Sequence, residues 1–241
     1  MLPKIDLPVY ELTLPSDGKT VRVRPFTVKE EKLLLIAAES DDENEIINTT
    51  VQVINNCLVD NDLDITKIPF FDVDYLFIAL RAKSVGEDIE IKFTCNNTLT
   101  DGTVCNNIFP AKIDIANCRI DKKENIENNI RLAPDVAVKM KYPSYNTMKS
   151  IIETMKDIDK EVHIIANSIE YIQDKEQIHT LKDLTKQNLI EFVEGLTQAQ
   201  YKKLEEFTDN FPSFFVETEV DCPRCGFHHK LEYRKFESFF V

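Results

Sequence analysis

Apolar and polar positions follow two different periodicities along the chain. Near the start, polar residues alternate with the apolar residues Tyr10, Leu12, Leu14, Val21 and Val23, and the turn-forming sequence Pro-Ser-Asp-Gly lies between the two groups. Apolar residues at every second position are typical of a half-buried strand. The pattern therefore predicts a β-hairpin over residues 9–25.

Three helices are predicted after this hairpin. Thr27 and Glu30 have the spacing of a capping box, which satisfies free N–H groups at a helix start. The second helix has its apolar stripe within residues 46–58, behind an acidic stretch that complements the helix dipole. Asp72 is expected to cap the third helix. Together these elements make up an N-terminal segment over residues 1–86.

After residue 86 the period of the apolar positions returns to two. An alternating strand leads to Cys95, and a polar loop then leads to Cys105 and a second alternating strand. The same order of strand, cysteine, connection, cysteine and strand recurs over residues 216–236, where Cys-Pro-Arg-Cys-Gly forms the turn. Two cysteine-tipped hairpins are therefore predicted, within residues 87–118 and 216–241.

The chain between these hairpins is predicted to be mostly helical. Residues 119–143 are interpreted as an exposed linker with short strands. Residues 144–215 are interpreted as a helical segment, because their apolar residues recur at helical spacing. Four helices are expected there, the second with its stripe from Val162 to Ile172 and the fourth capped by Thr197.

The four cysteines at the hairpin tips are the constellation with the clearest chemistry. Structural zinc takes four thiolates in a tetrahedron, usually as two pairs from two turns. Cys222 and Cys225 have the common spacing and are followed by Gly226, whereas Cys95 and Cys105 have a much wider spacing that indicates an enlarged turn. The sequence predicts structural zinc bound by these four residues, in a zinc-ribbon-like pair of hairpins within an α+β fold. Four thiols without metal are the alternative.

Other ligands and other thiol chemistry are less favoured. His228 and His229 point to opposite faces of a strand, so at most one could join the metal, and surface roles are expected for both. Cys57 lies on an apolar helix face and is expected in the core, and Cys118 lies too far from the hairpin tip. The Cys-Pro-Arg-Cys sequence resembles a dithiol redox motif, but it leads into a strand instead of opening a helix.

Composition argues against several classes of function. The chain has 42 acidic and 29 basic residues, a net charge of -13, and its basic residues form no cluster, which disfavours nucleic-acid binding. Its five glycines form no phosphate-binding loop, and its acids and histidines match no common catalytic motif, so neither an enzyme nor a small-molecule substrate is expected. Since no apolar run has the length of a membrane span, no membrane contact is expected, and a reducing cytosol is expected instead.

Two blocks of sequence carry a family resemblance. One runs from Leu2 through residues 10–16 and 23–32, and the other runs from Ile68 to Gly86. Both resemble the baseplate hub family of T-even-type contractile-tailed bacteriophages, and the cysteine turns are similar to those of its marine-phage members. The resemblance implies a non-enzymatic protein that contacts other phage baseplate hub or tail proteins. It also implies a location in the host cytoplasm during assembly and in the tail baseplate of the virion.

Two further functions stay open beside a retained hub subunit. One is an assembly chaperone that leaves before the tail matures, and the other is a zinc-ribbon adaptor that binds a host protein. Candidate partner contacts are Arg22, Arg24, Phe26, the pair Phe70–Phe71, and the apolar tail at 236–241. A structural interpretation is favoured for Phe26, as a hydrophobic staple, and for the Phe70–Phe71 pair, as core residues, so the apolar tail is the preferred candidate.

Overall fold

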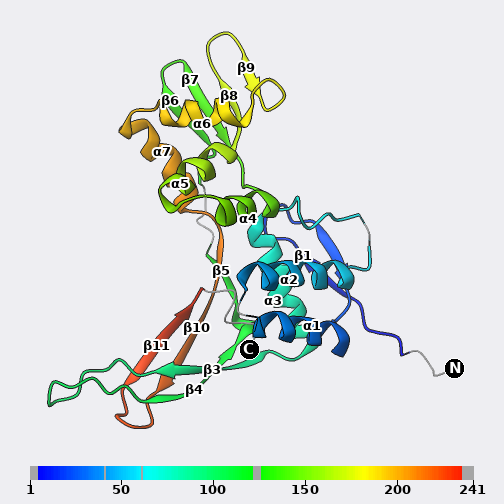
Figure 1. Ribbon diagram of the computed structural model, residues 1–241, viewed down its shortest axis with the longest axis vertical. Coiled ribbons are helices and arrows are strands. Elements are labelled where there is room, and N and C mark those ends of the chain that lie inside the picture. Colours follow the sequence, from blue (N-terminus) through cyan, green and yellow to red (C-terminus); the bar gives the residue numbers. More distant parts are fainter. Residues whose placement is uncertain (1–4, 41, 61, 122–125, 235–241) are drawn as a thin grey trace. The chain divides into compact units, whose positions relative to one another are not determined.

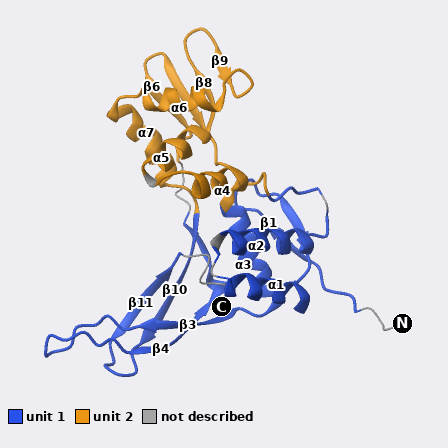
Figure 2. Ribbon diagram, viewed as in Figure 1, with its two compact units in different colours: residues 1–65, 71–121, 213–241 blue, residues 66–70, 122–212 orange. Residues whose placement is uncertain are grey.

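The computed structural model describes residues 5–40, 42–60, 62–121 and 126–234 (Figure 1). The apolar tail at 236–241 lies outside these residues. Two compact units are distinguished (Figure 2): the first comprises residues 1–65, 71–121 and 213–241, and the second comprises residues 66–70 and 122–212. Helices and small antiparallel sheets make up the described residues, so the predicted α+β class is confirmed.

The first unit opens with the predicted hairpin. Strand β1 (Tyr10–Thr13) pairs antiparallel with β2 (Thr20–Val23). The other edge of β2 is also bonded: the N–H of Val59 donates to the carbonyl oxygen of Arg22 at 2.9 Å. Leu12, Val21 and Val23 are buried, as their alternation predicts.

Three helices follow in this unit: α1 (Val28–Glu39), α2 (Glu43–Cys57) and α3 (Phe70–Ser84). The predicted capping box of Thr27 and Glu30 is present at the start of α1. Asp42, from the acidic stretch, caps α2 by accepting the N–H of Asn44 at 2.9 Å.

The prediction that Asp72 caps α3 is wrong. The helix begins at Phe70, directly after Pro69, so Asp72 lies in the first turn with its side chain buried. Its carboxylate accepts hydrogen bonds from Ser16 in the β1–β2 turn, from the N–H at 3.0 Å and from the hydroxyl. Because a buried carboxylate needs donors, this residue joins the helix to the turn.

The first unit also contains the two cysteine-tipped hairpins (Figure 1). Strand β3 (Asp88–Thr94) pairs antiparallel with β4 (Ile108–Asp114), and the short 3-10 turn η1 (Ile115–Asn117) follows. Strand β10 (Ser213–Asp221) lies between β11 (His228–Tyr233) and β5 (Arg119–Asp121) in a three-stranded sheet. The hairpins are in contact: the Thr218 hydroxyl of β10 donates to the carbonyl oxygen of Lys112 in β4 at 3.1 Å.

The second unit combines a sheet with helices. Its sheet has the order β6–β7–β8–β9, formed by β6 (Asn129–Ala133), β7 (Val136–Met140), β8 (Ile169–Gln173) and β9 (Ile178–Thr180). Its helices are α4 (Tyr145–Thr154), α5 (Asp157–Asn167), α6 (Lys186–Glu194) and α7 (Gln198–Asp209). Thr197 caps α7, as predicted.

Four helices lie within residues 144–215, but the predicted helical stripe from Val162 to Ile172 is wrong at its end, because β8 begins at Ile169 and β9 follows it. Helix α5 ends at Asn167, and the next residue, Ser168, is buried with its hydroxyl bonded to the carbonyl oxygen of Ile164 at 2.7 Å. Ile169 and Ile172 then pack in the core of this unit. Within the described part of the chain, no helix has both the length and the apolar character that crossing a membrane requires.

Candidate metal centre

The tip of the β3–β4 hairpin carries the first pair of cysteines. The N–H of Cys95 donates to the carbonyl oxygen of Asn107 at 2.8 Å, and the N–H of Asn106 donates back to the carbonyl oxygen of Cys95 at 3.0 Å. Asn106 has a left-handed φ of 49°, which asparagine tolerates better than most residues. These bonds bring Cys105 back beside Cys95, and the residues between them form a separate loop.

The tip of the β10–β11 hairpin closes with equivalent bonds around a much shorter turn. The N–H of Cys222 donates to the carbonyl oxygen of Phe227 at 2.9 Å, and the N–H of Gly226 donates to the carbonyl oxygen of Cys222 at 2.8 Å. Gly226 has a φ of 70° and follows the second cysteine, as Asn106 does in the other tip. Despite their different lengths, the two turns hold their cysteines in the same way.

The sulfur atoms of Cys95, Cys105, Cys222 and Cys225 all lie within 4.8 Å of one another. The Sγ atoms of Cys95 and Cys225 are 3.7 Å apart, and those of Cys105 and Cys222 are 3.9 Å apart. Two thiolates on one tetrahedral zinc, each at ~2.3 Å from the metal, are separated by about 3.8 Å, whereas a disulfide holds its sulfurs ~2.0 Å apart. The spacing therefore fits a shared metal ion better than disulfides.

Burial and hydrogen bonding act in opposite directions on the thiols. Cys95, Cys105 and Cys222 are buried, and Cys225 is partly exposed. Burial raises the pKa of Cys95 to about 12. Burial also opposes ionisation of Cys222, but the backbone N–H groups of Cys225 and Arg224, together with the thiols of Cys225 and Cys95, lower the pKa of Cys222 to about 6. Donors directed at a sulfur favour the thiolate, which is the form that binds metals.

Two asparagine side chains add further donors. The amide of Asn97 lies 3.6 Å from the sulfur of Cys225, and that of Asn107 lies 3.7 Å from the sulfur of Cys222. Both asparagines belong to the β3–β4 tip, and both sulfurs belong to the β10–β11 tip. Each amide thus contacts the opposite hairpin at its cysteine-bearing end, as groups that orient metal ligands commonly do.

The two neighbouring histidines have different environments, and the prediction of a surface role for both is wrong. His228 is exposed, and its Nδ1 lies 2.8 Å from a carboxylate oxygen of Asp221. His229 is buried, and its Nε2 lies 3.2 Å from the sulfur of Cys95. Since alternate residues of a strand face opposite sides, only one of the pair faces the cysteines.

Sequence reasoning missed three residues that contact the sulfurs, namely Asn97, Asn107 and His229. For His229 a signal was available, because it alternates along β11 with Leu231 and Tyr233 and so lies on the same face of the strand. Those two residues are also less exposed than their neighbours. For the asparagines no comparable signal exists, since polar residues are common in every hairpin loop.

The two remaining cysteines lie outside the four-sulfur cluster. Cys57 is fully buried, which confirms its predicted place in the core, and burial raises its pKa to about 12. Cys118 is partly buried, and burial raises its pKa to about 11. Neither thiol is readily ionised, so neither has the character of a nucleophile.

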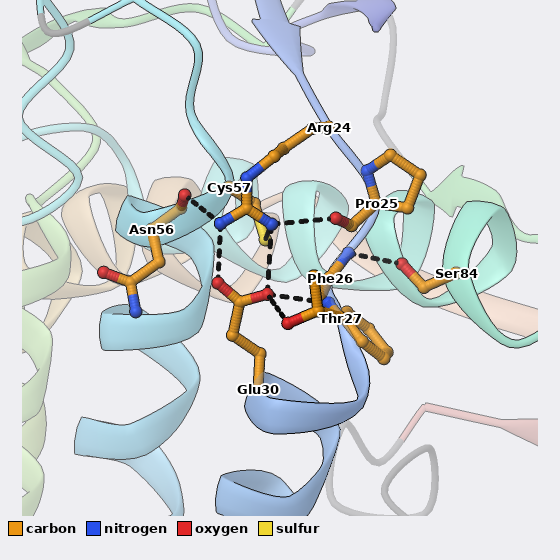
Figure 3. A network of polar contacts seen from close by, with 8 residues as sticks. All are labelled: Arg24, Pro25, Phe26, Thr27, Glu30, Asn56, Cys57 and Ser84. Atoms are coloured by element: carbon orange, nitrogen blue, oxygen red, sulfur yellow. Dashed lines mark hydrogen bonds and ion pairs between the residues drawn. The ribbon is translucent and has the colours of Figure 1, made fainter. Parts of the chain in front are cut away.

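A second polar cluster surrounds Arg24 (Figure 3). Its guanidinium pairs with the carboxylate of Glu30 at 2.6 and 3.0 Å and donates to the carbonyl oxygens of Pro25 and Asn56 at 2.9 and 2.8 Å. The same carboxylate accepts the N–H of Thr27 at 2.7 Å. Arg24 therefore serves the fold of the first unit.

The other candidate contacts are also used largely within the fold. Phe71 is buried, which confirms its interpretation as a core residue, whereas Phe70 is partly buried; Phe26 is buried as well. Arg22 is exposed, but it forms an ion pair with Asp60. None of these four residues is an unused surface anchor.

Comparisons with known proteins agree with the resemblance drawn from the sequence. The chain is similar to the baseplate hub assembly protein gp26 of Enterobacteria phage T4, with 24% identity over 232 residues that cover 96% of this chain and 97% of that protein. No solved structure matches the chain. Residues 7–241 match the family described as T4 bacteriophage base plate protein. Since this match covers almost the whole sequence, the chain belongs to that phage baseplate family.

Proposed function

We propose that the chain is a non-enzymatic protein of the phage baseplate hub, which acts in hub assembly through contacts with other baseplate or tail proteins. The observation that carries this proposal is the end-to-end similarity to a baseplate hub assembly protein, which covers nearly the full length of both chains. Its places of action are the host cytoplasm during assembly and the tail baseplate of the virion. Nucleic acid, membranes and small-molecule substrates are not among its partners in this proposal.

The proposal includes one structural zinc ion bound by Cys95, Cys105, Cys222 and Cys225. Tetrahedral sites of four sulfurs suit zinc or an iron–sulfur centre, and the two-pair arrangement on hairpin tips favours zinc. Four thiolates leave no open coordination position, so the ion has a structural role. It joins the hairpin within residues 87–118 to the hairpin within residues 216–241 into a zinc ribbon.

The zinc proposal is tested by the metal content of the purified protein. We expect about one zinc per chain, and we expect Cys222→Ser to release the ion and to lower the melting temperature, since metal binding contributes on the order of 10 kcal/mol in such sites. Cys118→Ser is the matched control, because Cys118 lies outside the cluster. A metal-free protein with unchanged stability would remove zinc from the proposal.

The role in assembly is tested with a tagged chain in infected cells and with purified tails. Capture of baseplate proteins together with stoichiometric presence in tails identifies a retained hub subunit. Capture of the same proteins without presence in tails identifies an assembly chaperone, which is the first alternative. Capture of host proteins alone would contradict the hub proposal and favour a zinc-ribbon adaptor.

A further inference from the structure

We propose that His229 is a positioning residue of the metal centre. Its imidazole donates a hydrogen bond from Nε2 to the metal-bound thiolate of Cys95 and thereby slows loss of the metal. The inference rests on the proposed zinc site, and it adds to that site a residue outside the four ligands. It starts from the 3.2 Å distance between Nε2 and Sγ.

The imidazole of His229 is held in a fixed orientation by two aromatic rings. The ring centroid of Phe93 lies 4.9 Å away and that of Phe227 lies 4.8 Å away, both in edge-on arrangements. Phe93 belongs to β3 and Phe227 precedes β11, so the histidine packs between the two hairpins. The side chain is only 5% exposed, and therefore little water competes for its contact with the sulfur.

The position of the proton follows from the chemistry of the acceptor. A metal-bound cysteine is deprotonated and can only accept a hydrogen bond. Nε2 of His229 must therefore carry the proton in the metal-loaded protein, which identifies the Nε2–H tautomer. Ligand orientation by such a donor is a general feature of metal sites.

His229 is placed to be a donor and is not placed to be a ligand. The group of potential ligand atoms that lie within 4.8 Å of one another consists of the four cysteine sulfurs and does not contain His229. Four thiolates already fill the coordination sphere of zinc. The imidazole therefore acts on the metal through Cys95.

The charge of the site explains why such a donor matters. A zinc ion with four thiolates has a net charge of -2, in a chain whose own net charge is already -13. Asn97 donates to Cys225 and Asn107 donates to Cys222. His229 supplies the corresponding side-chain donor for Cys95. Because this donor is buried, its loss cannot be replaced fully by water.

The first experiment uses the unaltered chain loaded with a spin-half isotope of cadmium in place of zinc. Nuclear magnetic resonance of the histidine rings is expected to place the proton of His229 on Nε2 and to show scalar coupling between this proton and the metal through the sulfur of Cys95. A proton on Nδ1, or no coupling from a proton on Nε2, would overturn the inference.

The second experiment compares variants by their rate of zinc release to excess chelator. His229→Phe fills the aromatic site without a donor and is expected to bind one zinc but to release it about 10-fold faster or more. His229→Gln keeps an N–H donor and is expected to release zinc at a rate much closer to that of the wild type. His228→Phe is the matched control, since His228 faces away, and it should behave like the wild type.

The two experiments separate the inference from the zinc proposal. Wild-type protein without metal contradicts the zinc site itself. Wild-type protein that binds zinc, together with His229→Phe that releases it at the wild-type rate, contradicts the role of His229 alone. In the cobalt-loaded protein, His229→Phe should also shift the thiolate-to-metal charge-transfer bands, which a purely packing role would leave unchanged. If His229→Phe does not fold, the magnetic resonance result on the wild type decides.

Discussion

At the scale of single residues, the pair of Arg24 and Glu30 ties the first hairpin to two helices. Glu30 belongs to α1, and the guanidinium also donates to the carbonyl oxygen of Asn56 near the end of α2. Glu30 is 6% exposed. The hydrogen bonds from Arg24, together with those from Thr27, lower the pKa of Glu30 to about 2 although burial acts to raise it. The carboxylate is therefore ionised in the folded protein over the whole physiological range.

Removing this carboxylate charge should destabilise the protein substantially. Glu30→Gln leaves the guanidinium of Arg24 partly buried without its counter-ion, and we expect the free energy of unfolding to fall by about 2–4 kcal/mol. Asp60→Asn is the matched control, because it breaks the exposed ion pair with Arg22 and should have little effect. Urea denaturation at neutral pH measures both, and equal losses would contradict the argument.

The same pair makes a specific contribution to acid sensitivity. The pKa of Glu30 is lower in the folded chain than the ordinary glutamate value of 4.5, so ionisation favours the folded state. This contribution is fully present above pH ~4.5 and is lost as the pH falls toward ~2. The stability difference between wild type and Glu30→Gln should therefore shrink across that interval. A difference that stays constant down to pH ~2 would show that ionisation of Glu30 is not its source.

At the scale of elements, the two hairpin tips solve the same geometric problem with different residues. In each tip the residue after the second cysteine has a left-handed backbone, Gly226 with a φ of 70° and Asn106 with a φ of 49°. This conformation turns the N–H of that residue toward the carbonyl oxygen of the first cysteine. The cost of a left-handed backbone is small for glycine and larger for residues with a Cβ atom.

This difference predicts opposite effects for two substitutions. Gly226→Ala should destabilise the protein by about 1–2 kcal/mol and speed metal release, because a Cβ atom there has free space but a strained backbone. Asn106→Gly should leave the stability of the hairpin tip unchanged or increase it slightly. Thermal melting and zinc release to a chelator measure both effects.

Gly102→Ala provides the control for these substitutions. Gly102 also has a left-handed φ, of 84°, but it lies in the loop between Cys95 and Cys105 and not beside a cysteine. Gly102→Ala should therefore introduce the same backbone strain as Gly226→Ala but leave the rate of zinc release unchanged. If Gly226→Ala also leaves that rate unchanged, the backbone at the short turn does not govern metal retention.

Elements defined by local pattern were predictable, and those defined by distant pairing were not. The alternation near Cys95 and the capping box of Thr27 are local signals, and the corresponding hairpin and helix are present. Strand β8 was mistaken for helix because Ile165, Ile169 and Ile172 also have helical spacing, and its strand state depends on pairing with β7. Strand β5 was missed because its strand state also depends on distant pairing: its partner is β10, far along the chain.

The clustering of the four cysteines was predictable to the same extent. The residue type and spacing of the four cysteines indicated that they meet, and their sulfurs do lie together. The groups that contact those sulfurs depend on how one hairpin packs on the other. Asn107 and His229 reach the sulfurs of the opposite hairpin. The alternation along β11 indicates the face on which His229 lies, but no pattern within one hairpin identifies the sulfur that it contacts.

At the scale of the whole molecule, the first unit is built from both ends of the sequence, and residues 122–212 of the second unit are inserted between strands β5 and β10. Each unit has a separate source of stability. The second has its own apolar core, which includes Val138, Ile165 and Leu204. In the first unit, the hairpins meet at the cysteines. Cys95 and Cys225, whose sulfurs are in contact, are 130 positions apart in the sequence.

Because only the first unit contains the sulfur cluster, metal removal should act on one unit alone. We expect a chelator to remove the protection of backbone amides against hydrogen exchange in β3, β4, β10 and β11. Hydrogen bonds between the hairpins, such as those of Arg224 to Cys105 and of Thr218 to Lys112, are weak in comparison with four metal bonds. Residues 129–140 and 169–173 should keep their protection, because they pack in the core of the second unit.

Hydrogen exchange measured by mass spectrometry follows both regions in one sample. The measurement is made before chelation, after chelation, and again after zinc is returned. Protection that persists in the hairpins without metal would mean that their own packing holds them together. Protection lost at the same time from residues 129–140 would mean that the two units unfold cooperatively. Selective and reversible loss in the hairpins is the result expected if the metal acts as a long-range cross-link. The metal then closes a loop that contains residues 122–212 of the second unit, while that unit keeps its own core.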